Sequence, residues 1–253
     1  MRNMAFRSSF FFSIGGNLLF IFLLYFLWQA IYRGSAQPTI NGMSFHDTYL
    51  YLCIANVLYL LFASGVDYWM AGTIGSGDIV MTLVKPMDWQ LQLMSMRLGA
   101  MAFNLLTVTV PTFIVISILL RPGIRLGVNL LFILPSCALA FTVSYLFDFF
   151  VGLIAFYTQS FWGFSMIKNY VIRAISGSMV PLALFPGALR TVMDWLPFKA
   201  IYDIPTRLLM DRSLDAAGML SALAFQAAWA IILFLASRLA FNRSIQRVMI
   251  HGG

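Results

Sequence analysis

The stretch TIGSGDIVMTLVKPMDWQ, residues 73–90, separates two long apolar runs and differs from both in its glycines, charges and proline. Its centre begins with Asp78, which suits the N-cap of a helix, and ends at Pro86, before which helices usually stop. Four apolar residues would share one side of that helix: Ile79, Val80, Leu83 and Val84. We expect a short helix along a membrane face, which would be either an inert linker or a helix that docks into a partner's groove.

The rest of the chain is apolar almost throughout. Of its 253 residues, 61% are hydrophobic and 10% are charged, and the mean hydropathy is +0.86. Soluble domains carry about 25% charged residues, and apolar runs of ~20 residues can cross a hydrocarbon core. The composition therefore indicates an all-α polytopic membrane protein.

Six apolar segments are long enough to be transmembrane helices within a single membrane domain covering residues 1–253. We expect them at residues 10–32, 48–71, 98–120, 128–158, 167–184 and 216–240. The fourth would be roughly 45 Å long as a straight helix. It should therefore tilt, kink near Pro135 or end at the interface.

An even number of spans places both termini on one side of the membrane. Nine of the sixteen basic residues fall on that side: Arg2, Arg7, Lys85, Arg97, Lys168, Arg173, Arg238, Arg243 and Arg247. Since lysine and arginine are enriched in cytoplasmic loops, we expect the termini and residues 73–90 to be cytoplasmic. The same rule accounts for the net charge of +7 without a nucleic-acid partner.

Residues that commonly carry catalysis are scarce in this chain. The glycines of GTIGSGD have the spacing of a phosphate loop, but Asp78 stands where the phosphate-binding lysine belongs, and no strand precedes it. The two histidines, His46 and His251, are far apart in the sequence, and no metal-binding motif is present. We therefore expect no enzymatic activity and no catalytic, cofactor or metal site in this chain.

Asp148, in SYLFDFFVGL, is the carboxylate that lies well inside a predicted span. Ionisable groups within a membrane are costly and often functional, so Asp148 is a candidate for binding a proton or a cationic substrate. Hydrogen bonds from a neighbouring tyrosine or serine would be an alternative role. Asp67, next to Tyr68 and Trp69, is expected at the membrane interface within an aromatic belt.

A second unusual segment is PLALFPGALRTVMDWLPFKAIYDIPTRLLMDR, residues 181–212. Its prolines break any straight helix, and the apolar pieces between them are too short to span a membrane. A re-entrant segment on the outer side, over residues 185–210, would accommodate them if its backbone is buried in protein. An aromatic interfacial loop would also fit.

Together, the two unusual segments and the spans resemble the permease subunits of type-2 ABC exporters, in particular a small six-span bacterial branch of mostly unassigned substrate. The loop after the second span of that branch carries a pattern close to I-x-x-G-x-L-D-x-x-L-x-x-P. The residues here are Ile74, Gly77, Asp78, Leu83, Lys85 and Pro86, with the leucine before the aspartate replaced. The outer segment matches at Phe185, Pro186, Leu189, Arg190, Leu196, Pro197, Phe198 and Pro205.

The resemblance implies a permease that works as a pair, with an identical or related chain, in the bacterial cytoplasmic membrane. A separate dimer of cytoplasmic ABC ATPases would bind ATP and Mg²⁺, and this chain would bind no cofactor. Residues 73–90 would then form the coupling helix that docks on the ATPase. We expect export of an amphiphilic or hydrophobic substrate, such as a peptide antibiotic, a drug or a lipid-like molecule. The alternative is an ion- or proton-coupled secondary transporter that uses Asp148.

Overall fold

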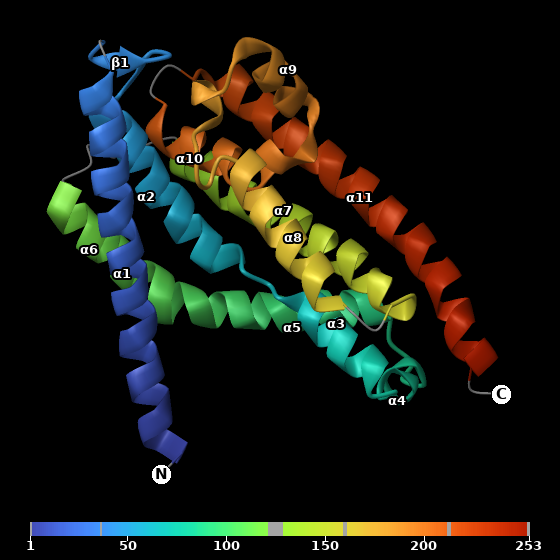
Figure 1. The fold of residues 1–253 in the computed structure, drawn as a ribbon. Helices are drawn as coiled ribbons and strands as arrows, with labels where there is room; N and C mark the ends of the chain where they lie inside the picture. Colours follow the sequence, from blue (N-terminus) through green and yellow to red (C-terminus); the bar gives the residue numbers. More distant parts are fainter. Residues whose placement is uncertain (1, 36, 121–128, 159–160, 212–213, 252–253) are drawn as a thin grey trace.

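The computed structural model describes residues 2–35, 37–120, 129–158, 161–211 and 214–251, and almost all of these form helices (Figure 1). The α-helices are α1 (Arg2–Gly34), α2 (Phe45–Phe62), α3 (Val66–Gly75), α4 (Ile79–Leu83), α5 (Trp89–Asn104), α6 (Val110–Leu120), α7 (Asn129–Gly152), α8 (Phe161–Ile175), α9 (Gly187–Trp195), α10 (Asp203–Met210) and α11 (Ala216–His251). Short π and 3-10 segments are η1 (Leu105–Thr109), η2 (Leu153–Phe156), η3 (Leu182–Leu184) and η4 (Pro197–Ala200), and the strands are β1 (Thr39–Ile40) and β2 (Met43–Ser44).

Within the described part of the chain, five segments are long and apolar enough to cross a membrane. They are Gly15–Gly34, Phe45–Gly75, Trp89–Ile118, Leu131–Phe156 and Ala216–Gln246. Each overlaps one of the predicted spans at residues 10–32, 48–71, 98–120, 128–158 and 216–240. The predicted class, an all-α multi-pass membrane protein, is therefore confirmed.

The helix expected over residues 167–184 differs from the prediction. It is α8, which has 15 residues and ends at Ile175, so it is shorter than the ~20 residues of a full crossing. The chain leaves the helix because Gly177 takes a φ of +92°, and Pro181 cannot continue a helical hydrogen-bond ladder. The sequence prediction placed the end of this helix too late.

The apolar run predicted as one span at residues 48–71 is two helices. The first, α2, ends at Phe62 and α3 begins at Val66, with Gly65 between them at a φ of +55°. The carbonyl of Gly65 accepts a hydrogen bond of 3.3 Å from an Nη of Arg97. The same carbonyl also accepts a 3.3 Å hydrogen bond from the amide of Trp69, so the Arg97 contact joins α5 to the first turn of α3.

The two other long helical segments also differ in detail from the expected spans. The run from α5 through η1 to α6 begins at Trp89, well before residue 98, because the Asp88 carboxylate caps it by accepting a 3.0 Å hydrogen bond from the amide of Leu91. The helix α7 continues through Pro135 and into η2, which extends it to Phe156.

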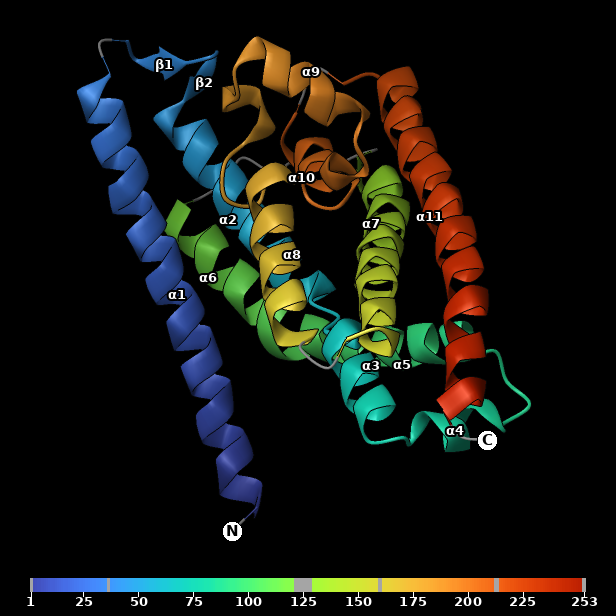
Figure 2. The ribbon, with the colours of Figure 1, turned by 45° about the vertical axis from the view of Figure 1, so that its right-hand side comes forward.

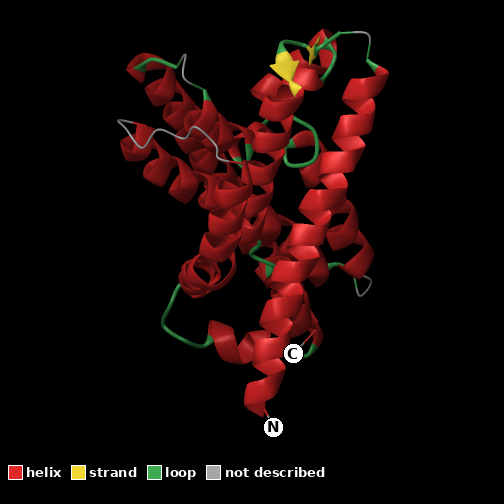
Figure 3. Ribbon diagram, turned by 90° about the vertical axis from the view of Figure 1, so that its left-hand side faces the viewer, coloured by secondary structure: helices red, strands yellow, loops and turns green. Residues whose placement is uncertain are grey.

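The elements form a bundle with two distinct ends. The N-terminus, the C-terminus and α4 lie at one end, and the β1–β2 hairpin and α9 lie at the other (Figures 1 and 3). Because α8 runs back along α7, the chain returns towards the hairpin end before α11 descends (Figure 2). The hairpin turn is Asn41–Gly42, with positive φ at both residues, and Asn41 donates a 3.3 Å hydrogen bond to the carbonyl of Leu184.

Candidate functional site

Three charged side chains meet inside the bundle, one each from α3, α7 and α8. Lys168 Nζ lies 2.8 Å from Asp67 Oδ2 and also forms an ion pair with Asp148 Oδ1. The side chains of Lys168, Asp67 and Asp148 are 8%, 0% and 10% exposed. We refer to these three residues as the charge cluster.

Two serines complete the charge cluster. Ser64 donates a hydrogen bond to Asp148 Oδ2, and Ser165 donates one to Asp67 Oδ2. Ser64 lies in the break between α2 and α3, so the break is what brings this hydroxyl to Asp148. The remaining oxygen, Asp67 Oδ1, is buried and has no hydrogen-bond partner among the residues that the structure describes.

A cavity of about 150 Å³ adjoins the charge cluster. Besides cluster residues, its walls include Tyr59, Phe62, Tyr68, Asn169, Arg173 and Tyr202. The Arg173 guanidinium lies 4.3 Å from the centre of the Tyr59 ring, a cation–π contact. The cavity therefore combines aromatic faces with charged groups.

The sequence predicted Asp148 inside a span, Asp67 at the membrane interface and Lys168 on the cytoplasmic side, and the structure agrees with the first of these. Asp148 is buried within a helix that can span a membrane, as expected. Asp67 is not in the exposed position of an aromatic belt: Tyr68 and Trp69 are 41% and 36% exposed, but Asp67 is completely buried against Lys168. The sequence prediction placed Lys168 on the cytoplasmic side, at the start of the span expected over residues 167–184. In the structure it lies inside the bundle, and its position at the edge of an apolar segment was the signal that its charge needs a partner.

The stretch expected to be the coupling helix forms a shorter helix than its length suggests. Asp78 occupies the N-cap position of α4, as predicted, but its carboxylate accepts a 2.7 Å hydrogen bond from Ser76 instead of capping the helix. Ile79 is buried, and Ile74 and Leu83 pack against the core. Gly77 has a φ of +80° in the preceding turn, while Lys85 and Pro86 are exposed.

The outer side of this stretch is apolar and open. Its exposed side chains are Val80 (51%), Met81 (74%), Val84 (78%) and Met87 (60%). The expected apolar side is therefore divided: Ile79 and Leu83 face the protein, whereas Val80 and Val84 face outwards. We refer to Val80, Met81, Val84 and Met87 as the α4 surface.

The residues that follow α4 are bound tightly to two long helices. Asp88 forms an ion pair with Arg238 of α11, and the Gln90 backbone carbonyl accepts a 2.6 Å hydrogen bond from Tyr145 of α7. The Trp89 ring packs between Phe149 and Phe241, with centroids 5.9 Å and 5.4 Å away. The stretch that follows α4 is therefore joined to both α7 and α11.

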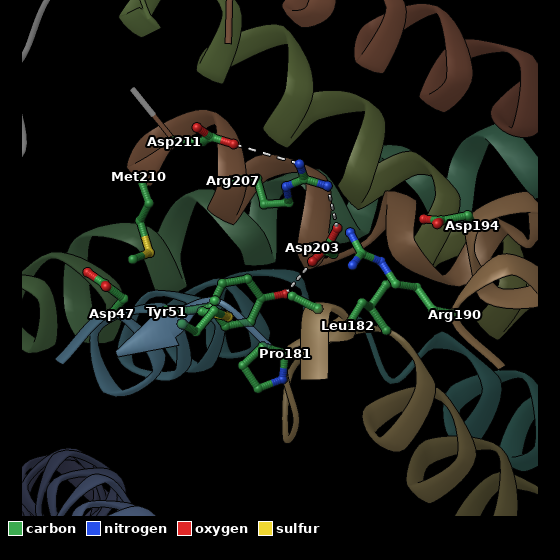
Figure 4. A pocket seen from close by; sticks show the side chains of 13 residues that line it. Asp47, Tyr51, Pro181, Leu182, Arg190, Asp194, Asp203, Arg207, Met210 and Asp211 are labelled. Atoms are coloured by element: carbon green, nitrogen blue, oxygen red, sulfur yellow. Dashed lines mark hydrogen bonds and ion pairs between the residues drawn. The ribbon is translucent and has the colours of Figure 1, made fainter. Parts of the chain in front are cut away.

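The segment predicted to be re-entrant lies at the hairpin end and covers a second cavity, of about 350 Å³ (Figure 4). At its wall, Tyr51 donates a 2.7 Å hydrogen bond to Asp203, whose other oxygen lies 4.0 Å from Arg207. Burial raises the pKa of the Asp203 carboxyl above its usual value, against the opposing effects of Arg207 and the Tyr51 hydrogen bond.

The outer residues identified in the sequence have different surroundings. Arg190 lines the 350 Å³ cavity, and Pro197 and Pro205 are buried. The Phe198 ring stacks on Phe147 of α7 at 5.1 Å. The remaining four are partly or fully exposed: Phe185, Pro186, Leu189 and Leu196. These outer residues and the α4 surface lie at opposite ends of the bundle (Figure 1).

The apolar helices of membrane-crossing length, with the charge cluster buried between them, define a multi-pass integral membrane protein. The model of the ABC-2 family transporter protein matches residues 18–252, so the chain belongs to this family. The sequence-based prediction of an ABC-2 type permease is thereby confirmed. No curated protein and no solved structure matches the chain.

Proposed function

We propose that this ABC permease subunit exports an amphiphilic or hydrophobic substrate and is driven by a separate dimer of cytoplasmic ATPases that bind ATP and Mg²⁺. It works with a second permease copy, identical or related, in the bacterial cytoplasmic membrane, with both termini in the cytoplasm. Membership of the ABC-2 family supports the ATP-driven mechanism. The direction and the substrate class rest on the resemblance carried by residues 73–90 and 185–210.

The α4 surface is the observation that carries this proposal. Four apolar side chains are exposed on α4 and the turn that follows it, at the end where both termini lie, next to the exposed Lys85. Such a helix suits insertion into a groove of a partner. Because Asp88 and Trp89 attach the same stretch to α11 and α7, movement of a docked ATPase would displace these two helices.

The outer segment, residues 185–210, would close the path of the substrate at the hairpin end. It covers the 350 Å³ cavity at the hairpin end and is held to α2 by the Tyr51–Asp203 hydrogen bond and to α7 by the Phe198–Phe147 stack. We infer that displacement of α7 loosens these contacts and opens the outer end to a substrate.

The test is co-purification of the tagged chain from its own cells in mild detergent, followed by identification of bound proteins and an ATP hydrolysis assay. The proposal expects a soluble ATPase that is lost when residues 78–86 are altered. Recovery of the chain without ATPase in several detergents would favour the secondary transporter instead. For that alternative, Asp148→Asn and collapse of the ion gradient should each abolish transport.

A further inference from the structure

We propose that the carboxylates of Asp67 and Asp148 form a binding site for a primary ammonium group. Lys168 occupies this site in the present conformation, and the amine of a substrate occupies it when α8 moves away. The substrate part rests on the proposed function, whereas the ammonium site itself depends only on the geometry of the charge cluster.

The charge cluster has an unused acceptor. Asp67 Oδ2 accepts from Lys168 and Ser165, and the two oxygens of Asp148 accept from Lys168 and Ser64. Within the described part of the chain, Asp67 Oδ1 has no donor, although Asp67 is completely buried and lines the adjoining cavity. Because a buried carboxylate oxygen without a partner is unfavourable, the site has the capacity for a further N–H donor.

The adjoining cavity suits a small alkylammonium ion. Its volume of about 150 Å³ is that of roughly five water molecules in the liquid. The rings of Tyr59, Phe62 and Tyr202 form part of its wall, and aromatic faces attract cations. These three rings lie outside α8, so they would remain beside the carboxylates after α8 withdraws with its own wall residues Lys168, Asn169, Ile172 and Arg173, and the carbon chain of an amine would lie against them.

Two arginines lie nearby, and each has a contact outside the charge cluster and a buried Nε with no hydrogen-bond partner among the described residues. Arg173 lies over the Tyr59 ring, and Arg97 donates to the carbonyl of Gly65. Among the described residues, the ion pairs of Asp67 and Asp148 are both with Lys168. Lys168 is thus the cation whose departure would leave the two carboxylates without an ion-pair partner.

Lys168 is carried by a helix that has few fully buried residues. In α8, the fully buried residues are Phe161 and Ser165, while Trp162, Ile167 and Tyr170 are 66%, 64% and 58% exposed. The contacts of α8 with α3 and α7 include the polar ones of Ser165 and Lys168 and the ring contact between Phe161 and Tyr68. If α8 withdraws, Lys168 leaves with it, and two buried carboxylates without a cation are too unfavourable to persist. A substrate ammonium offers the same N–H donors at the same place.

The test is rescue of a Lys168→Ala variant by an untethered amine. This substitution removes the ammonium and leaves its space open, so the purified variant should melt at a lower temperature than the unmodified protein. Ethylammonium should restore at least half of that loss, with a midpoint that rises with the logarithm of amine concentration. Sodium chloride and tetramethylammonium, which has no N–H donor, should restore none of it.

Lys168→Met is the matched control, because its side chain fills the same space without a charge and should give no response to ethylammonium. A response of equal size in Lys168→Met or with sodium chloride, or no response in Lys168→Ala, would overturn the proposal.

A second variant keeps the test decisive if Lys168→Ala does not fold. Lys168→Ala combined with Asp148→Asn removes part of the charge imbalance, and ethylammonium should still raise its melting midpoint through Asp67; no response would overturn the proposal. Both measurements are made without an ATPase. A chain that responds to amine but purifies without ATPase would contradict the exporter function alone, and the reverse result would contradict the ammonium site alone.

Discussion

The side-chain amide of Gln90, at the start of α5, donates a hydrogen bond of 2.8 Å to the hydroxyl of Ser237 on α11, and both residues are buried. The neighbouring ion pair between Asp88 and Arg238 joins the same two helices, but its side chains are 26% and 39% exposed. The two contacts therefore connect the start of α5 to α11 in very different surroundings.

These surroundings predict unequal effects on stability. Gln90→Ala should lower the free energy of unfolding by about 1–3 kcal/mol, since a buried hydrogen bond and its packing are lost. Asp88→Asn should cost less than about 1 kcal/mol, because exposed ion pairs contribute little and asparagine caps a helix as well as aspartate. Denaturation of both variants in detergent, followed by tryptophan fluorescence, measures the difference. Equal losses would contradict the prediction.

The α4 surface should bind a partner without contributing to the fold. Met81→Glu and Val84→Glu replace side chains that are 74% and 78% exposed, so each should change the free energy of unfolding by no more than about 0.5 kcal/mol. Under the proposed function both should abolish co-purification of the ATPase. Val192→Glu, at a 56% exposed position of α9 at the other end of the bundle, is the control and should leave ATPase binding intact. If all three variants bind ATPase equally, α4 is not the docking helix.

The charge cluster predicts a strong asymmetry between its members. Lys168→Met should lower the free energy of unfolding by about 3–5 kcal/mol, because it leaves two buried carboxylates without an ion-pair partner. Asp148→Asn should lower the free energy of unfolding by less, since Lys168 keeps its 2.8 Å contact with Asp67. In the double variant, the two losses should fall short of additivity by about 0.5–3 kcal/mol. Thermal unfolding of the three variants completes this cycle, and strictly additive losses would show that Lys168 and Asp148 do not interact.

Gly177 should not tolerate a side chain. Its φ is +92°, and a Cβ there would lie 2.3 Å from the hydroxyl of Tyr51. Gly177→Ala should therefore cost about 1–3 kcal/mol in backbone strain, and it should also displace Tyr51 from Asp203. Gly99→Ala is the matched control, because the helical Gly99 has open space around it and alanine should be stabilising by roughly 0.5–1 kcal/mol. A comparison of the two melting curves tests this, and a stable Gly177→Ala variant would disprove the tight contact.

Asp203 should make the stability depend on pH. Burial raises the pKa of its carboxyl in the folded state above the unfolded value, so the folded state binds the proton more tightly. The free energy of unfolding should then fall as the pH rises from about 4, the usual aspartate value, through the raised pKa. Asp203→Asn removes this contribution, so the variant should lose less stability than the unmodified protein over that range. Unfolding midpoints measured across the range would show it, and parallel pH profiles would refute it.

The length of the apolar runs was enough to predict the membrane class and the five segments that can cross a bilayer. The break at residues 63–65 was not predicted, because short apolar and small residues on both sides leave the run continuous in composition. The end of α8 was misplaced for a related reason: its cause is the left-handed conformation of Gly177, and a glycine within an apolar run does not reveal its φ in advance.

The charge cluster was predicted only in part, since its contacts join residues distant in the sequence. Asp148 could be identified from its apolar neighbours, but its pairing with Lys168, and that of Lys168 with Asp67, depends on the packing of α3, α7 and α8. The predicted apolar side of α4 was correct for Ile79 and Leu83, which face the protein, and wrong for the other two residues. A helix of five residues is too short for a 3.6-residue period to assign both of its sides, and Val80 and Val84 face outwards.

The break at Gly65 also has a mechanical consequence. A helix interrupted at one residue is compliant there, so a tilt of α3 can be absorbed by rotation about residues 63–65 before it reaches α2. The 36 residues of α11 form one uninterrupted helix, about 54 Å long, which is stiff along its axis. Under the proposed function, displacement of the Asp88–Arg238 ion pair should therefore be transmitted along α11 to the hairpin end. The helix α2, which lies before the break, should keep its position.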